Sequence, residues 1–467
     1  MLTSAISTTE IQNTLAAQKN FFDSGATQSL SFRREQLQKL YDAIVQNENE
    51  IFAALHADLH KSKFESFGTE IGLVLGEIKH TLRKLATWMR PQKVGTSLFH
   101  FPASSYTQAE ALGQVLIIAP WNYPFQLLFS PLVGAIAAGN TVVLKPSEIA
   151  ENCSRLFTRI VRETFSSEYM AIFEGGVEVS QSLLAEKYDM IFFTGSTPVG
   201  KVVYQAAAKH LTPVVLELGG KSPCIVAADA PLATTAKRIV WGKFVNAGQT
   251  CIAPDYIFAH KSIVQELIAE LAKAIEAFYG SNIEASPDYP RIINEKNFNR
   301  LVQLISDEKI VYGGKADKAA LYISPTILYP ADAKDAAMQE EIFGPILPIL
   351  PYENLESIVH FIRQRPKPLA LYVFSKNNKT IDYIMQNTSA GGCTINDTLI
   401  HLANDNMHFG GVGESGIGGY HGKSSFEAFS HQKAITRRGL WLDVPLRYPP
   451  YNRISLNSLK WLFKNVM

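Results

Sequence analysis

The sequence is poor in cysteine and lacks long apolar runs, and both absences exclude whole classes of protein. No CxxC pair or nearby histidine cluster accompanies its four cysteines, Cys153, Cys224, Cys251 and Cys393. A disulfide framework and a metal site are therefore not expected, and the cysteine use predicts a reducing compartment, the cytoplasm. The chain does not begin with a basic region followed by an apolar one, as a secretory signal does. No apolar run approaches the ~18 residues of a membrane-spanning helix, so no transmembrane segment is predicted.

An excess of charge of either sign is also missing. The 467 residues carry 44 basic and 43 acidic side chains, for a net charge of +1. No electrostatic field favours nucleic acid or an acidic membrane surface, so neither is expected as a partner. Internal repeats and low-complexity blocks are absent, which argues against solenoids and disordered tails. A chain of this length is expected to form two or three domains.

The first ninety residues are predicted to form helices. Apolar residues recur there at spacings of three and four, which is typical of a helix face packed on a core. One stripe is Leu37, Leu40, Tyr41, Ile44 and Val45, and a second is Ile71, Val74, Ile78, Leu82 and Leu85. Pro91 ends this region, and residues 94–106 are expected to be irregular.

Short β-prone runs alternate with longer segments from residue 107 onward. The runs are Val115–Ala119, Thr141–Lys145, Ala171–Glu174, Met190–Thr194 and Val214–Glu217. Helix-length segments separate them, which predicts βαβ units and a doubly wound parallel sheet. Beyond Gly220, helices are expected over 230–244 and 263–279, and strands near 326–328 and 371–374, which indicates a second domain.

Polar residues collect where the predicted strands end, and ligands bind at that edge of a doubly wound sheet. The first strand leads to Asn122, the second ends at Lys145 with Glu148 close behind, and the fifth ends at Glu217. The fingerprint GxGxxG is absent from the first turn. Gly195 to Gly200 instead form GxxxxG at the start of a helix, whose N-terminus can receive a phosphate.

Cys251 stands in a predicted turn, FVNAGQTCIAPDY. It is either an inert buried thiol or a nucleophile, which must ionise to react. Glu217 at a nearby strand end could take a proton from the thiol or from a water. Asn122 and the N–H of Cys251 could stabilise an oxyanion. The alternatives are a capping or solvated acid for Glu217 and a turn residue for Asn122.

Six motifs occur in a fixed order, PWNYP, LKPSE, FTGSTPVG, LELGGKSP, GQTCIAPDY and EEIFGP. As a set they resemble the aldehyde dehydrogenase superfamily, over a span from about residue 20 to 440. The forms GQTCIAPDY, GGYHGKSSFEAFSH and RYPPY further resemble its class 3 and fatty aldehyde branch. The resemblance implies a Rossmann-like doubly wound cofactor domain, an α/β catalytic domain and a small β bridging arm for oligomerisation.

The resemblance also implies roles for single residues. Cys251 attacks an aldehyde to give a thiohemiacetal, Asn122 belongs to the oxyanion hole, and Glu217 activates the water that hydrolyses a thioester. The implied cofactor is NAD or NADP, with NAD favoured because Glu148 would bond a ribose 2′-OH and repel a 2′-phosphate. The residues matched to cofactor contacts are Lys145, Glu148, Gly195, Ser196, Gly200, Glu341 and Phe343.

Several of these matches have plainer interpretations. Glu341 could be a helix acid beside Glu340, and Phe343 a core aromatic. Tyr123 and His421 are candidates for the substrate region, although a histidine in Gly-Tyr-His-Gly is as readily a loop or packing residue. The other three cysteines are expected to be structural thiols.

The resemblance divides the chain into an NAD(P)-binding domain at 1–88 and 107–219 and a catalytic domain at 220–412. Residues 89–106 and 425–440 match the arm by which members of the family dimerise, and 441–467 form a tail. The tail is apolar over 457–464 but carries two lysines. We expect a helix docked on a homodimer, with interfacial membrane contact as the alternative.

The expected reaction is oxidation of a medium- or long-chain aliphatic, or an aromatic, aldehyde to its carboxylic acid. One alternative transfers the acyl group to coenzyme A, which the retained Glu217 argues against. The other is a non-catalytic protein on the same scaffold, which the complete set of Cys251, Glu217 and Asn122 argues against.

Overall fold

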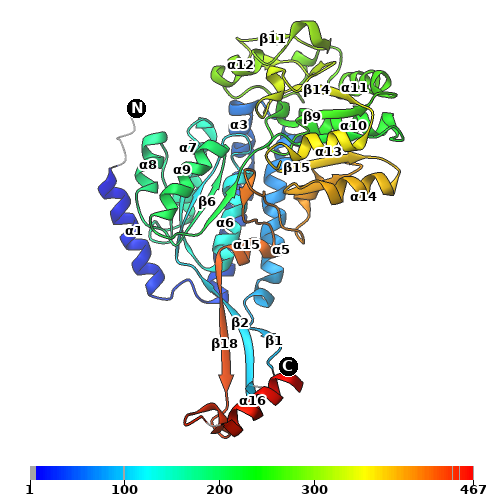
Figure 1. The fold of residues 1–467 in the computed structure, drawn as a ribbon. Coiled ribbons are helices and arrows are strands. Elements are labelled where there is room, and N and C mark those ends of the chain that lie inside the picture. The colour runs from blue at the N-terminus through cyan, green and yellow to red at the C-terminus, as the bar shows by residue number, and fades with distance from the viewer. Residues whose placement is uncertain (1–6, 98–99, 444, 452, 466–467) are drawn as a thin grey trace.

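Two mainly parallel sheets, each covered by helices, form the body of the molecule, and a narrow antiparallel sheet projects from it (Figure 1). This computed structural model describes residues 7–97, 100–443, 445–451 and 453–465. The predicted α/β fold class with a doubly wound sheet is confirmed.

The first sheet has the strand order β17-β7-β6-β3-β4-β5. All neighbouring strands are parallel except the short β17, which pairs with β7 antiparallel. From β3 the following strands are added first on one side, as β4 and β5, and then on the other, as β6 and β7, which is typical of doubly wound sheets. The elements are β3 (Gln114–Ile118), α6 (Gln126–Ala138), β4 (Thr141–Lys145), α7 (Glu151–Thr164), β5 (Met170–Ile172), α8 (Val177–Leu184), β6 (Met190–Thr194), α9 (Thr197–Ala208), β7 (Val214–Glu217) and β17 (Gly416–Ile417).

Helices cover both faces of this sheet. Leu116 and Ile118 pack on one face with residues of α1, α8 and α9, whereas Val115 and Ile117 pack on the other with residues of α6 and α7. Neighbouring residues of a strand point to opposite faces, so a strand buried on both sides is apolar throughout. This burial explains why β4, β6 and β7 begin and end at the predicted residues.

The N-terminal region is helical as predicted and packs against the first sheet. It consists of α1 (Thr8–Asp23), α2 (Leu30–Gln46), α3 (Glu48–Leu59), α4 (Lys63–Ser66), the π-helix η1 (Phe67–Ile71) and α5 (Gly72–Trp88). Leu37, Leu40 and Ile44 of the first predicted stripe are buried. Val45 was wrongly included, because its side chain is 47% exposed. Each helical residue turns by about 100°, which carries Val45 away from the face of Ile44.

The second sheet has the order β10-β13-β14-β9-β8-β15-β16 and is parallel except at β10. A hairpin of β11 and β12 lies apart from it. The elements are β8 (Pro223–Val226), α10 (Leu232–Phe244), β9 (Tyr256–His260), α11 (Val264–Tyr279), α12 (Glu295–Val302), β10 (Ile310–Tyr312), β11 (Ala316–Asp317), β12 (Tyr322–Ile323), β13 (Thr326–Leu328), β14 (Ile346–Tyr352), α13 (Leu355–Arg363), β15 (Ala370–Phe374), α14 (Asn378–Asn387) and β16 (Gly392–Ile395).

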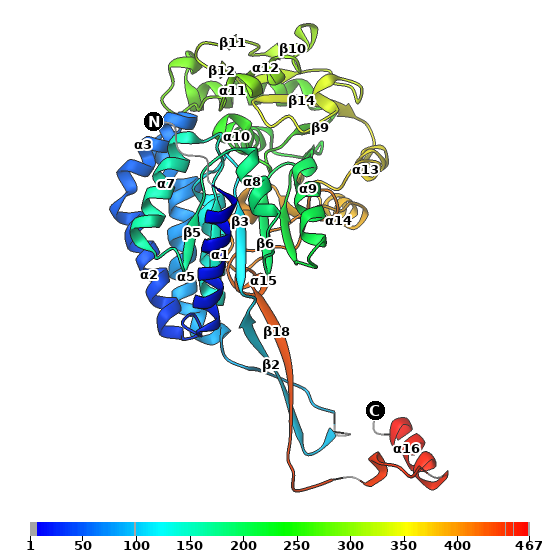
Figure 2. The same cartoon turned by 90° about the vertical axis from the view of Figure 1, so that its left-hand side faces the viewer.

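The projecting arm is a three-stranded antiparallel sheet of β1 (Gln92–Val94), β2 (Ala103–Ala111) and β18 (Ser430–Arg438). The last two strands lie side by side along its whole length (Figures 1 and 2). The expectation of irregular structure is wrong for 103–106. Those residues belong to β2, which runs past the expected boundary at 106 because Ala111 still pairs with Ser430.

The chain leaves the first sheet through α15 (Lys423–Ala428), enters β18 and ends in α16 (Arg453–Asn465). This last helix lies at the far end of the arm from the body (Figure 2). Residues 98–99 of the expected arm, and 444, 452 and 466–467 of the expected tail, lie outside the described residues. Of the helices that the structure describes, none is long and apolar enough to cross a membrane.

Candidate active site

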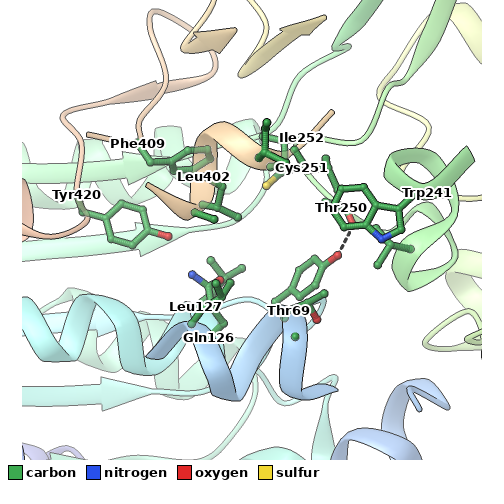
Figure 3. Close-up of a pocket in the computed structure, with 17 residues that line it drawn as sticks. Thr69, Gln126, Leu127, Trp241, Thr250, Cys251, Ile252, Leu402, Phe409 and Tyr420 are labelled. Atoms are coloured by element: carbon green, nitrogen blue, oxygen red, sulfur yellow. Dashed lines mark hydrogen bonds between the residues drawn. The ribbon is translucent and has the colours of Figure 1, made fainter. Parts of the chain in front are cut away.

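A pocket with mainly apolar walls has Cys251 in its lining (Figure 3). Cys251, Thr250 and Ile252 form one wall, and Thr69, Gln126 and Leu127 lie opposite them. Further apolar side chains come from α10 and from the segments that follow β16, among them Trp241, Leu399, Leu402 and Phe409. A thiol therefore faces a space suited to an apolar molecule.

The loop before Cys251 has an unusual backbone. After α10 ends, Asn246, Ala247 and Gly248 have φ values of 53°, 51° and 75°. Non-glycine residues rarely adopt this left-handed region, and each costs roughly 1–3 kcal/mol when its surroundings force it. A Cβ on Gly248 would lie 2.3 Å from the carbonyl oxygen of Gly344. The loop is thus pressed against the EEIFGP segment, and the predicted turn is present.

Side-chain amides hold this loop in place. Gln249 donates to the carbonyl oxygens of Asn246 at 3.0 Å and Arg291 at 2.9 Å, and accepts from the N–H of Ile293 at 3.0 Å. The N–H of Asn246 donates to Glu65 at 2.9 Å. These hydrogen bonds inside the protein hold the turn in one conformation, which offers a fixed support for Cys251.

The Cys251 side chain is half-buried. Burial, followed by the nearby carboxyl groups of Glu341 and Glu217, raises the pKa of the Cys251 thiol, while the N–H groups of Cys251 and Ile252 lower it. The thiol therefore holds its proton in this state, and it needs a base before it can attack.

Glu217 ends β7 and is 2% exposed. Neither of its carboxyl oxygens has a hydrogen-bond partner among the described residues. Burial raises the pKa of Glu217 well above its usual value of 4.5. A buried carboxyl group without a partner is costly in a folded protein, so its retention at a strand end indicates a functional group.

Asn122 reaches the Cys251 loop directly. Its side chain is buried, and its Nδ2 donates to the carbonyl oxygen of Gln249 at 3.0 Å. Tyr123 follows, and its hydroxyl lies 2.6 Å from the hydroxyl of Thr250 (Figure 3). The structure thus brings Asn122 and Tyr123 to the Cys251 loop, and Tyr123, unlike Asn122, belongs to the lining of the pocket.

Lys145 and Glu148 lie together at the carboxyl end of β4. The lysine Nζ is 3.2 Å from Glu148 Oε2 and donates to the carbonyl oxygen of Pro146 at 2.7 Å. The lysine side chain is 1% exposed, whereas that of Glu148 is 40% exposed. Burial lowers the pKa of Lys145, and Glu148 opposes that shift. The pair leaves the Glu148 carboxylate accessible at the sheet edge.

The GxxxxG segment opens α9 as expected. Ser196 is the N-cap but makes no side-chain capping bond, which leaves N–H groups of the first turn for another acceptor. A Cβ on Gly195 would lie 2.5 Å from the Phe193 ring, and one on Gly200 would lie 2.6 Å from Leu218. Both positions therefore need glycine for close packing between the helix and the sheet.

Glu341 and Phe343 lie between the two sheets, not in a helix. The helix interpretation of Glu341 is therefore wrong. Glu341 stands outside the helices and strands, and the N–H of Ile342 donates to Asp255 at 3.0 Å. A Cβ on Gly219 would lie 2.0 Å from Glu341 Oε2. Burial raises the pKa of Glu341 to about 8.

Phe343 packs edge-on against Trp121 with 5.4 Å between the ring centroids. Its φ of 52° is left-handed, and it is only partly buried, so it is not an ordinary core aromatic. The candidate cofactor residues thus follow the edge of the first sheet from β4 through α9 to the EEIFGP segment.

His421 does not belong to the pocket lining, unlike its neighbour Tyr420. Its ring stacks on that of Tyr420 at 4.1 Å, and its Nδ1 is 3.5 Å from Glu77 Oε2. The structure gives it a packing position behind the pocket. Of the three thiols that were expected to be structural, Cys153 and Cys224 are buried. Cys393 on β16 is exposed, so it does not belong to the core.

Several residues at this site were not identified from the sequence. Trp241 and Tyr420 line the pocket, and Asn246 belongs to the Cys251 loop. Lys61 bonds to the carbonyl oxygen of Asn122, and Glu70 accepts from the N–H of Phe125. Asn246 lies in the stretch around Cys251, and Tyr420 precedes His421, so proximity to a motif was a usable signal for these two. Lys61 and Glu70 stand in ordinary helical sequence, and nothing in their spacing marks them.

Comparison with known proteins relates the whole chain to one family. The model of the aldehyde dehydrogenase family matches residues 2–435. The 4,4'-diaponeurosporen-aldehyde dehydrogenase of Staphylococcus aureus is 49% identical, over 96% of this chain and 98% of that one. Aldehyde dehydrogenase family 3 member A2 of Pongo abelii is 47% identical, over 93% of this chain and 90% of that one. The structure of S. aureus AldH in its substrate-bound state has a TM-score of 0.96 at 48% identity, over 97% and 99% of the two chains.

Proposed function

Because the chain belongs to the aldehyde dehydrogenase family, within which it resembles family 3, we propose that Cys251, Glu217 and Asn122 carry out its reaction. The reaction oxidises an aldehyde to a carboxylic acid with NAD(P)+. The observation that carries the assignment is the buried carboxyl group of Glu217, without a hydrogen-bond partner among the described residues, close enough to Cys251 to raise the pKa of its thiol.

The steps follow from these three groups. The Cys251 thiol first gives its proton to a water molecule, and the sulfur then bonds to the carbonyl carbon while an electron pair moves to the carbonyl oxygen. Asn122 Nδ2 and the N–H of Cys251 donate to that oxyanion. Departure of a hydride leaves a thioester on Cys251. Glu217 then takes a proton from water, whose oxygen attacks the thioester carbon, and the sulfur leaves with its electron pair.

The sheet edge fits a dinucleotide cofactor. Uncapped N–H groups at the start of α9 suit a phosphate, and the accessible carboxylate of Glu148 suits a ribose hydroxyl. Glu341 Oε1 is a buried oxygen without a partner among the described residues, which suits a second hydroxyl. NAD(P)+ supplies the hydride acceptor when bound. We favour NAD because Glu148 would repel a 2′-phosphate.

Substitution at Cys251 and Glu217 tests this assignment. The Cys251→Ala variant is expected to lose aldehyde oxidation, by at least about 10⁴-fold, while it still folds and binds NAD+. The Glu217→Gln variant should form one equivalent of NADH rapidly and then turn over slowly, because only thioester hydrolysis lacks its base. Both are measured by stopped-flow absorbance of NADH. Retained turnover in the first variant, or normal steady-state turnover in the second, would contradict the assignment.

We propose a medium- or long-chain aliphatic, or an aromatic, aldehyde as substrate. The apolar pocket walls support this, as does the name of the S. aureus relative, a 4,4'-diaponeurosporen-aldehyde dehydrogenase. An apolar pocket gains roughly 0.8 kcal/mol for each methylene it buries. Among straight-chain aldehydes, kcat/KM should therefore rise by about fourfold per methylene until the pocket is full. A steady-state series run with NAD+ and with NADP+ measures this, and a flat series would contradict the proposal.

Transfer of the acyl group to coenzyme A is not favoured, since the relatives are dehydrogenases and Glu217 is retained. We further propose a homodimer formed through the arm and a cytoplasmic location. The exposed β18 and the apolar surface of α16 support the first. The four free cysteines support the second.

A further inference from the structure

A fully buried ion pair lies just outside the pocket. Lys61 follows α3 and Glu70 lies in the π-helix η1, and both side chains have 0% exposure. Lys61 Nζ is 2.5 Å from Glu70 Oε1. Buried pairs of this kind seldom stabilise a fold more than apolar residues would, because both charges must leave water. Their contacts indicate another role.

Both members of the pair hold the backbone of the segment that carries Asn122. Lys61 Nζ donates to the carbonyl oxygen of Asn122 at 3.1 Å and lies 4.0 Å from the centre of the Tyr123 ring. Glu70 Oε2 accepts from the N–H of Phe125 at 2.9 Å and of Gln126 at 3.3 Å. One ion pair thus fixes both ends of residues 122–126, where the chain enters α6.

The π-helix explains how Glu70 reaches this segment. The N–H of Gly72 bonds to the carbonyl oxygen of Phe67, so the chain makes a wide turn between α4 and α5. Such turns shift the following side chains around the helix axis and occur often at functional sites. Gly68 and Thr69 line the pocket, whereas Glu70 is buried against the start of α6. The π-helix therefore contributes two residues to the pocket lining and also Glu70, which holds the start of α6.

The segment is also tied to the Cys251 loop. Asn246 Nδ2 donates to the carbonyl oxygen of Asn122 at 2.7 Å and to that of Gln249 at 3.1 Å. The carbonyl group of Asn122 therefore receives one donor from the loop and one from Lys61. Without Lys61, only the loop would hold the backbone of Asn122, and the other end of the segment would face the unpaired charge of Glu70.

We propose that Lys61 and Glu70 are positioning residues for aldehyde oxidation, which hold the Asn122 carboxamide where it stabilises the oxyanion on the attacked carbonyl. This inference rests on the role of Asn122 in the proposed function. Both side chains are fully buried, and their hydrogen bonds go to each other and to the backbone of residues 122–126, so they act through that segment. Displacement of a catalytic group by about 1 Å typically costs about 10²-fold in rate, so loss of the support should be visible.

The test measures the rate of the first-turnover NADH burst. The Lys61→Met variant and the double variant Lys61→Met/Glu70→Gln, which also removes the carboxylate that Lys61 pairs with, should both lose about 10- to 100-fold. The Kd for NAD+ should change by less than about twofold, because the cofactor edge is separate from this segment. Thermal unfolding verifies that each variant is folded.

A matched control breaks an ion pair elsewhere. Lys309 and Asp335 are 2.5 Å apart, with side chains 23% and 17% exposed, and they lie beside β10 in the second domain. Lys309→Met should leave the burst rate within about twofold of the wild type, even where it lowers the unfolding temperature. An equal loss in this control would overturn the positioning role, because the loss would then follow from general destabilisation.

A double-mutant cycle with Asn122 separates positioning from a structural effect. If Lys61 acts through Asn122, then Lys61→Met should cost less than about threefold in an Asn122→Ala background. The positioning role would be overturned if the losses from Lys61→Met and Asn122→Ala multiplied in full when the two substitutions are combined. A wild-type burst rate in the folded Lys61→Met/Glu70→Gln variant would overturn it as well. A wild-type burst rate in Asn122→Ala alone would instead overturn the proposed role of Asn122, so the two failures are distinguishable.

Discussion

At the scale of single residues, burial favours the neutral forms of three ionisable groups at the site. Burial raises the pKa values of Cys251 and Glu217, and it raises the pKa of Glu341 to about 8. One of these groups must lose its proton before a thiolate can attack. A raised pKa brings a carboxyl group closer to the pH at which it can exchange protons as a base, at a cost in stability.

Glu217 should therefore make the protein less stable as the pH rises. The pKa of Glu217 is about 4.5 in the unfolded chain and higher in the folded chain. Between these two pKa values the unfolded chain binds fewer protons than the folded chain, so the free energy of unfolding falls as the pH rises. The slope reaches at most about 1.4 kcal/mol per pH unit. Glu217→Gln removes the titrating group, so its unfolding temperature should rise relative to the wild type as the pH increases above about 4.5.

Differential scanning calorimetry of both proteins measures this difference. The two unfolding temperatures should approach a constant separation below about pH 4, where the carboxyl group is protonated in both states. Unfolding temperatures that differ by the same amount at every pH would show that the pKa of Glu217 is not raised. With a raised pKa for Glu217, the Glu217→Gln variant that slows hydrolysis gains stability at neutral pH, as expected where activity requires a strained group.

At the scale of elements, the first sheet could be predicted because its burial leaves a strong local pattern. Strands such as β4 and β6 are buried along their whole length and apolar at most positions, and helix-length segments bound them. The arm leaves no such pattern. Residues of β2 are exposed or half-buried, and the strand forms because β18, from the far end of the chain, pairs with it. Pairing over that separation has no local signal.

The candidate site divides in the same way. Cys251, Glu217 and Asn122 stand at strand ends or in a turn rich in glycine and proline, and such positions can be recognised in a sequence. Lys61 and Glu70 act through contacts with residues 122–126. The contact of Glu70 depends on the π-helix, which could not be predicted from the spacing of its residues. For His421 the sequence left a substrate contact and a packing role open, and its ring stacks on Tyr420 outside the pocket lining.

At the scale of the whole molecule, the arm separates α16 from the body. The helix lies beyond the end of β18 in both views (Figures 1 and 2). Large apolar side chains on it are exposed, with Ile454 at 77% and Trp461 at 63%. Apolar surface of this kind is normally covered by a partner. A second copy of the chain is the partner that the proposed dimer would supply.

Deletion of residues 441–467 tests this. The unfolding temperature should change by less than about 2 °C, because α16 lies away from the cores of both sheets. The Kd for dimerisation should rise by at least about tenfold as apolar contact area is lost. Sedimentation velocity over a range of concentrations measures this, with the full chain as control. Equal dissociation constants would place α16 outside the dimer contact. If, in addition, only the full chain bound phosphatidylcholine vesicles, the helix would instead lie at a membrane surface.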